Sequence, residues 1–343
     1  MNKATTTLPK GIKNPQISPL LGLVLGIIIL LISLVFSVTL GAAEIPLGKI
    51  LESFVIFDGS YDHLVIQTVR LPRSLIGILV GAALAVAGAL MQGLTRNPLA
   101  DPGILGIEAG ATLAVVATIF VFGNLPLTAL TFVAFLGAAT TAILVYFLGS
   151  LGRGGLTPLN LTVAGAALTA LISSLTTAIL IVSQRTLDEI RFWLAGSLAG
   201  RDFNILLQVL PFVSVGLLVA FALGRQITTM NLGEDVAKGL GQQTARLKII
   251  TGISVVLLVG SSVSLAGPIG FIGLVVPHIV RFFIKADYRW ISPYSAVMGA
   301  ILILIADIAA RILLKPQELP VGVMTALVGA PFFVYLAKSK VKK

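Results

Sequence analysis

Cysteine is absent from this 343-residue sequence, histidine occurs only twice, and charged residues are scarce. Without cysteine the chain forms no disulfide, thiolate metal site or cysteine nucleophile. It contains neither the HExxH motif of zinc proteases nor the GxxxxGK[ST] loop of nucleotide hydrolases, so ATP hydrolysis by a P-loop is excluded. Charged residues make up 11% of the chain, against about 25% in soluble domains. Such a chain cannot cover a water-facing surface, and lipid must be its solvent.

Long apolar runs fill most of the chain, and 57% of the residues are hydrophobic. The runs are continuous and about 20 residues long, as in membrane-spanning helices, and they are not the alternating segments of about ten residues that form β-barrels. The sequence therefore predicts an all-α, polytopic membrane protein with about ten transmembrane helices, one of them short for a full crossing. The predicted spans are 20–40, 70–93, 104–123, 126–149, 156–183, 204–224, 247–266, 269–284 (the short one), 291–314 and 320–337.

Basic residues are spread unevenly over the connections between these spans. The net charge of +10 could indicate nucleic-acid binding, but Lys/Arg-rich cytoplasmic loops are the simpler explanation in a membrane protein. With both termini in the cytoplasm, 16 of the 24 Lys and Arg residues lie on that side. The first apolar run exceeds the about 7–15 residues of a signal-peptide core, so we expect an uncleaved helix. The prediction is a multi-pass plasma-membrane protein with a cytoplasmic tail at 1–19, a transmembrane region at 20–337 that includes a polar cytoplasmic loop at 225–248, and a basic tail at 338–343.

Glycines recur at four-residue spacing, and small residues allow helix backbones to pack closely. Two short segments, LADPGILG at 99–106 and LAGPIGFIG at 265–273, are also similar to each other. On opposite sides of the membrane they would form an inverted repeat, with helix breaks at the membrane edge. The glycine pairs are Gly22/Gly26, Gly77/Gly81, Gly106/Gly110 and Gly196/Gly200.

Five stretches carry a resemblance to a known family. They are RLPRSLIGILVGAALAVAGALMQGLTRNPLADPGILGIEAGA (70–111), GEDVAKGLG (233–241), GPIGFIGLVVPHIVR (267–281), ADIAAR (306–311) and ELPVGVMTALVGAPFF (318–333). In this order they resemble the FecCD-type permeases of binding-protein-dependent ABC importers, which carry iron–siderophore complexes, haem or cobalamin. The resemblance runs from about residue 20 to residue 337, and it implies the fold of the large importer permeases.

The resemblance also implies a function and a set of partners. The chain would form a translocation pathway with a second permease, identical or sister, and would itself bind no cofactor and catalyse no reaction. ATP and Mg²⁺ would be used by two separate ATP-binding subunits, and an extracytoplasmic binding protein would deliver the cargo; no nucleic acid is implied. The segment WLAGSLAGRDF (193–203) resembles siderophore permeases more than cobalamin ones. Ferric siderophore is therefore the expected cargo, and haem or cobalamin is the alternative.

The polar loop at 225–248 is the expected site of coupling to the ATP-binding subunits. Its GEDVAKGLG segment predicts two short helical pieces split by glycines. A solvated loop would need no partner, but by resemblance this loop sits in a groove of the ATPase, where small residues allow close approach and a leucine fills a pocket. The expected coupling residues are Gly233, Glu234, Ala237, Gly239, Leu240 and Gly241.

Arginines stand at the predicted outer ends of two spans. Arg70 and Arg73 begin the second span, and Arg311 ends the ninth. Arginine at a helix end often anchors the helix at the membrane interface. By resemblance, these three instead pair with acidic residues of the binding protein, which would set register and association rate. The amphipathic segment 183–203 is expected to lie along the same outer surface.

Two predicted cytoplasmic turns resemble the two sides of the family's cytoplasmic gate. Asn97 and Leu99 lie in the NPLADP turn, and Leu156 and Thr157 follow the sequence GSLGRGG. The alternative interpretation is ordinary turn chemistry around the neighbouring prolines.

Three ionisable residues within the spans need separate interpretation. His278 is a lone histidine near the cytoplasmic end of its span and is expected to be structural, hydrogen-bonded to a loop. Asp307 would be neutralised by Arg311, one helical turn further on. Glu108 stands where a small or neutral polar residue is expected, and the sequence offers no account of it.

Two other functions stay open when the residues are considered alone. A secondary transporter driven by an ion needs buried ionisable residues that change charge, and Asp307 and Glu108 are the only candidates. An intramembrane serine protease would use Gly260-Ser261-Ser262 with His278 on the next span. The spacing of these residues is loose, and serine at a helix edge is common.

Overall fold

The computed structural model describes residues 18–41, 45–123, 125–151, 157–284 and 286–341, whose regular secondary structure is entirely helical. A π-helical turn at Ile66–Arg70 and a 3₁₀ turn at Pro102–Leu105 accompany the α-helices. The α-helices are α1 (Pro19–Thr39), α2 (Leu47–Val55), α3 (Tyr61–Val65), α4 (Leu71–Thr95), α5 (Ile107–Phe122), α6 (Leu127–Ser150), α7 (Pro158–Val182), α8 (Gln184–Leu194), α9 (Phe203–Ala222), α10 (Gly224–Asn231), α11 (Glu234–Gly239), α12 (Thr244–Ala266), α13 (Ile272–Phe283), α14 (Tyr288–Ile312) and α15 (Val321–Val341).

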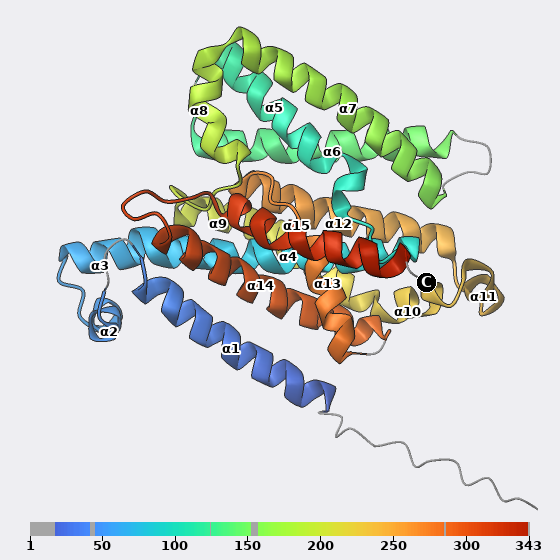
Figure 1. Ribbon diagram of the computed structural model, residues 1–343, viewed down its shortest axis with the longest axis horizontal. Coiled ribbons are helices and arrows are strands. Elements are labelled where there is room, and N and C mark those ends of the chain that lie inside the picture. Colours follow the sequence, from blue (N-terminus) through green and yellow to red (C-terminus); the bar gives the residue numbers. More distant parts are fainter. Residues whose placement is uncertain (1–17, 42–44, 124, 152–156, 285, 342–343) are drawn as a thin grey trace, which may run out of the picture.

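Each of the ten predicted spans corresponds to one of these helices. Seven of the described helices are long and apolar enough to cross a membrane, and α5, α13 and the apolar part of α15 are shorter. Figure 1 shows that α1 begins and α15 ends at the same end of the molecule, the end that also carries α10 and α11. A chain that crosses a membrane an even number of times begins and ends on the same side, as these two helices do. The predicted all-α, polytopic fold is therefore confirmed.

The mostly buried α4 is the central helix of the fold. A Cβ atom at Gly81 would overlap the carbonyl of Gly299 in α14, and one at Gly88 would overlap that of Gly273 in α13. Gly110 of α5 approaches the backbone of α6 in the same way. Because lipid supplies no hydrophobic drive between helices, such close backbone packing is what holds them together.

Replacing Gly81 by alanine is expected to destabilise the protein by about 1–3 kcal/mol, because the new methyl group meets fixed backbone rather than a movable side chain. Gly252 in α12 is the matched control, since a Cβ there meets nothing within 4 Å. Gly252→Ala should be neutral or stabilising by up to about 1 kcal/mol, from helix propensity alone. Melting temperatures of the purified variants test this pair, and equal values would contradict the packing described here.

The short helix α13 contains a proline whose effect on the backbone is compensated by side chains. Pro277 has no N–H, so the carbonyl of Gly273 lacks its helical partner. Gln92 of α4 donates to that carbonyl from Nε2 at 3.1 Å and accepts from Arg281 Nη1 at 2.6 Å. Arg281 Nη2 also donates to the hydroxyl of Tyr288 at 2.9 Å. This network satisfies polar groups that lipid could not.

The two segments that resemble each other in sequence also meet in space. The turn at Pro102–Leu105 leads into α5, and residues 267–271 connect α12 to α13. A Cβ atom at Gly273 would contact the ring of Pro102. Both are helix breaks that pack against each other, and irregular backbone is tolerated in a membrane where protein receives it. The inverted-repeat relationship itself stays a prediction.

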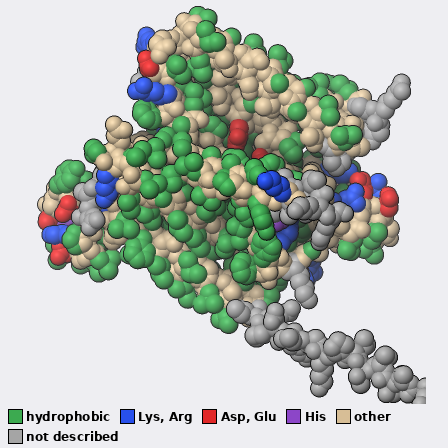
Figure 2. All heavy atoms as spheres, in the orientation of Figure 1, with side chains coloured by type: hydrophobic (Ala, Val, Ile, Leu, Met, Phe, Trp, Pro, Cys, Tyr) green, Lys and Arg blue, Asp and Glu red, His purple; other side chains and the backbone are tan. Residues whose placement is uncertain are grey.

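Helices α5, α6, α7 and α8 form a group that lies to one side of the others in Figure 1. Contacts of α12 with α5 and α6 join this group to the remaining helices. Figure 2 shows a surface that is largely hydrophobic, with charged side chains gathered mainly towards the ends of the molecule. It also shows acidic atoms in the hollow between the α5–α8 group and the rest. Such acidic groups, away from both ends, are candidates for function.

The structure corrects the prediction at the second span, in the GEDVAKGLG segment and at the C-terminal helix. The second span does not begin at Arg70, because α3, the π-helical turn and α4 form one helix from Tyr61 to Thr95. The segment GEDVAKGLG contains one short helix, α11, and not two; the other short helix of the loop, α10, precedes it. Gly233, whose φ is 130°, separates α10 from α11. At the C-terminus, α15 continues past residue 337 to Val341.

Candidate functional site

Helices α10 and α11 form a polar projection at the end of the molecule where α1 begins and α15 ends. Ala237, within α11, is fully buried, whereas Leu240, which follows the helix, is 68% exposed. A Cβ atom at Gly239 or Gly241 would meet nothing within 4 Å. The projection thus presents the exposed apolar side chains of Leu232, Val236 and Leu240 beside small, open glycines, a surface suited to a groove in another protein.

Glu234 ties this projection to the transmembrane region. Its carboxylate accepts a hydrogen bond from Lys248 Nζ at 2.9 Å and pairs with Lys238 at 3.2 Å. Because Lys248 belongs to α12, the contact links α11 directly to a long apolar helix. The hydrogen bond from Lys248 lowers the pKa of Glu234, so this link is intact at neutral pH and is lost only as the pH falls through that lowered pKa. Partner docking at the six predicted coupling residues stays a prediction.

At the opposite end of the molecule, two arginines surround one buried carboxylate. Arg73 Nη2 lies 2.8 Å from Asp307 Oδ1, and Arg311 Nε lies 3.1 Å from Asp307 Oδ2. Arg73 Nη1 also binds Glu318 at 2.6 Å. The predicted pairing of Asp307 with Arg311 is confirmed. Arg73 was missed as a partner because it is distant in sequence, and only its basic charge in an apolar run hinted at a buried acid.

The arginines at this end also cap the C-terminus of α1 by donating hydrogen bonds to its last carbonyl groups. Arg70 Nη1 donates to the carbonyls of Val38 and Thr39 at 2.8 Å, and Arg311 Nη1 donates to that of Ser37 at 2.9 Å. The last carbonyls of a helix have no helical partner and carry the negative end of its dipole. All three predicted docking arginines are therefore buried and hold the fold together, so they are not snorkelling anchors. Contact with a binding protein stays a prediction.

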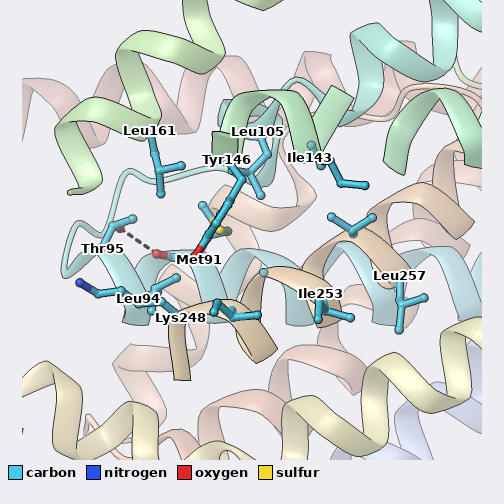
Figure 3. Close-up of a pocket in the computed structure, with 14 residues that line it drawn as sticks. Met91, Leu94, Thr95, Leu105, Ile143, Tyr146, Leu161, Lys248, Ile253 and Leu257 are labelled. Carbon is cyan, nitrogen blue, oxygen red and sulfur yellow. Dashed lines mark hydrogen bonds between the residues drawn. The ribbon is translucent and has the colours of Figure 1, made fainter. Parts of the chain in front are cut away.

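An apolar cavity of about 270 Å³ lies between α4, α6, α7 and α12. Figure 3 shows Leu161 and Tyr146 on one side of it, facing Met91 and Leu94 on the other. Lys248, which binds the α11 projection, also lines the cavity. Lys248 therefore connects the α10–α11 projection to this cavity.

The described gate residues Asn97, Leu99 and Thr157 lie close in sequence to Thr95 and Leu161, which line this cavity. Asn97 follows the end of α4, and its Oδ1 accepts from the backbone N–H of Leu99 at 3.0 Å. Thr157 caps the start of α7, where its hydroxyl accepts from the N–H of Asn160 at 3.1 Å. These are ordinary side chain–backbone bonds of turns and helix caps. Leu156 lies outside the described residues, and gating by the four stays a prediction.

Comparison with known proteins decides the family. The sequence profile of the FecCD transport family matches residues 29–339. The chain belongs to this family.

Relatives of this FecCD protein match over nearly its whole length. It is 50% identical to the probable siderophore transport system permease protein YfiZ of Bacillus subtilis, over 92% of this chain and 95% of that protein. It is 41% identical to the Fe(3+)-citrate import system permease protein YfmD of the same organism, over 95% and 97%. A solved inward-facing conformation of a metal-chelate type ABC transporter is 32% identical, with a TM-score of 0.82 over 92% of this chain and 98% of that one. The chain is thus an ABC transporter permease, and ATP is hydrolysed by a separate subunit.

In this FecCD permease, Glu108 is a half-buried residue in the first turn of α5. Gly106, two residues earlier, packs against Thr141 and Thr169. The part of α6 from Thr141 to its end at Ser150 corresponds to about 14 Å of helix. The Glu108 side chain borders a cavity of about 310 Å³ together with hydroxyl groups of α5 and α7. The sequence offered no account of Glu108, because most of the hydroxyl groups beside it belong to α7, which is distant in sequence.

The residues of the protease alternative are engaged in other contacts. Ser262 Oγ donates to the carbonyl of Leu258 in its own helix at 2.8 Å. The His278 ring lies edge-on to Phe282 and Phe332, with centroids 5.4 and 5.8 Å away. A serine bonded within its helix and a histidine packed between aromatic rings agree with structural roles.

Proposed function

We propose that this permease carries ferric siderophores inward across the plasma membrane, driven by ATP hydrolysis in its partner subunits. The main support is its near-full-length similarity to YfiZ, whose name specifies siderophore transport. YfmD is named for ferric citrate, another iron chelate. Haem or cobalamin is the alternative cargo, and neither named relative favours it.

Three kinds of partner complete the proposed transporter. A second permease, identical or sister, forms the pathway with this chain, and two ATP-binding subunits that use ATP and Mg²⁺ receive the α10–α11 projection. A binding protein docks at the opposite end around Arg70, Arg73 and Arg311, which line a cavity of about 180 Å³ there. In the proposed arrangement both termini and the projection lie in the cytoplasm, in agreement with the uneven distribution of Lys and Arg.

The contacts of α11 suggest how ATP-driven movement reaches the pathway. A displacement of α11 is transmitted through the Glu234–Lys248 contact to α12. Lys248, Ile253 and Leu257 of α12 line the apolar cavity between the two predicted gate turns. Movement of α12 would therefore change the separation of α4 and α7 at the cytoplasmic end.

Uptake of radiolabelled ferric iron tests the cargo. Cells with and without this gene are compared for several ferric siderophores, for haem and for cobalamin. Loss of uptake for one class of siderophore, restored by the gene, is the expected result. Loss for haem or cobalamin alone would keep the transporter and overturn the cargo.

Glu108→Gln separates an ATP-driven permease from an ion-coupled transporter. An ion-coupled carrier depends on an intramembrane carboxylate that changes charge, so this variant would abolish its transport. In an ATP-driven permease we expect uptake to stay within about threefold of the wild type, since less than 1 kcal/mol is at stake. Initial uptake rates, normalised to the amount of protein in the membrane, decide between the two.

A further inference from the structure

A cavity of about 800 Å³ lies at the end of the molecule that carries the Asp307 cluster. It is bordered by α5, α6, α8 and α12 and by the residues just before α15. Trp193 and Ile119 contribute apolar surface, and Thr131 and Ser264 contribute hydroxyl groups. Pockets that bind small molecules typically enclose about 300–1,000 Å³ and combine an apolar lining with a few polar groups.

Four charged side chains line this cavity, and three of them are already neutralised. Arg73 is held by Asp307 and by Glu318, the second acid also being a lining residue. Glu189 is paired with Arg185 at 3.0 Å. The remaining charged group is Arg201.

Arg201 is a buried cation whose counter-charge is missing among the described residues. The residue is only 9% exposed, and its Nε has no hydrogen-bond partner in the described part of the chain. The adjacent carboxylate of Asp202 instead caps α9, accepting from the N–H of Ile205 at 3.0 Å. Burial lowers the pKa of Arg201 to about 10, so the guanidinium is still charged at neutral pH. Uncompensated buried charge is costly, and a bound anion would remove the cost.

We propose that Arg201 anchors a binding site for an anionic iron chelate, donating hydrogen bonds to a carboxylate or similar anionic group of the cargo. This rests on the proposed function and adds a chemical class of cargo to it. A planar guanidinium is suited to bidentate binding of carboxylate. The charge is nine-tenths buried within a cavity of small-molecule size, which favours a chelate over an acidic side chain of the binding protein.

Direct binding to the purified full chain tests the site. Trp193 lines the cavity and the chain has only one other tryptophan, Trp290, so Trp290→Phe leaves a single reporter beside the site. Ferric citrate, which has free carboxylates, should quench its fluorescence saturably. Arg201→Gln should weaken the apparent affinity about tenfold or more, because a charge-assisted hydrogen bond is lost. Equal affinities with and without Arg201 would overturn the proposal.

Controls separate this result from other effects. Arg191→Gln removes an exposed arginine from α8 and should leave the affinity unchanged. A chain with Trp193→Phe and Trp290 retained should show only absorption of light by the chelate. A ferric trihydroxamate without free carboxylates should bind Arg201→Gln and wild type within about twofold of each other, whereas equal losses for both chelates would indicate a structural role and overturn the proposal.

The rate of uptake by cells is a second, independent measure of the effect of Arg201→Gln. We expect a selective rise in KM for carboxylate-bearing chelates. A loss of uptake with unchanged chelate binding would instead assign Arg201 to the binding protein and overturn the proposal. If wild type binds ferric citrate through Arg201 but transports no iron, the proposed function fails while this site stands. If wild type transports iron but Arg201 has no effect on binding, the site alone fails.

Discussion

Asp307→Ala is expected to remove most of the folded protein from the membrane. Asp307 is 1% exposed and is the carboxylate shared by Arg73 and Arg311. Removing one partner of a buried ion pair costs about 3–5 kcal/mol. Here one substitution removes the buried carboxylate that both guanidinium groups bind. The measurement is the amount of monodisperse protein after extraction, together with its melting temperature.

Two further variants make the Asp307 prediction specific. Asp188→Ala removes a carboxylate that is about half exposed on α8, and such surface pairs are worth about 0–1 kcal/mol. The yield of this variant should therefore match the wild type. Combining Asp307→Ala with Arg73→Met removes one of the stranded charges and should recover part of the lost stability. Normal yield and melting temperature for Asp307→Ala alone would contradict the central role of this cluster.

Leu240→Asp is expected to abolish transport while leaving the permease folded. Leu240 caps the C-terminal end of α11 and is 68% exposed, so a charge there does not disturb the interior. In a partner's groove, however, loss of an apolar anchor costs about 2 kcal/mol or more, roughly thirtyfold in affinity. Co-purification of the ATP-binding subunit and the initial rate of iron uptake are the measurements.

Val55→Asp is the matched control for the leucine variant. Val55 is 81% exposed on the short helix α2, at the end of the molecule opposite α11. This variant should retain the ATP-binding subunit and the wild-type uptake rate. If Leu240→Asp transports iron at that rate too, the α10–α11 projection does not couple the chain to its ATPase.

The sequence predicted the spans well because a long apolar run in lipid can satisfy its backbone hydrogen bonds only as a helix. A continuous run of about 20 apolar residues must form a helix to satisfy its backbone, and each predicted segment did so. The predicted boundary at Arg70 was wrong for a reason that a sequence does not contain. A charged residue was assumed to mark the membrane surface, whereas carbonyls at the end of α1 allow Arg70 to be buried within a longer helix.

The candidate sites were predictable only where their residues are close in sequence. The pairing of Asp307 with Arg311 follows from helical spacing, but Arg73 reaches the same carboxylate from another helix. Glu108 was recognised as an ionisable residue within a span, but the polar cavity beside it is formed largely by α7, which is distant in sequence. Arg201 stood in a motif that suggested siderophore transport, yet its missing counter-charge is visible only when all neighbouring acids are placed.

Transport by the complete assembly reconstituted in lipid vesicles tests the central claim most directly. The permease, its ATP-binding subunits and its binding protein are supplied with radiolabelled ferric siderophore, with no ion gradient across the membrane. The account predicts accumulation of iron that requires ATP and is lost with Leu240→Asp. Accumulation that needs no ATP and follows an imposed proton or ion gradient would contradict it.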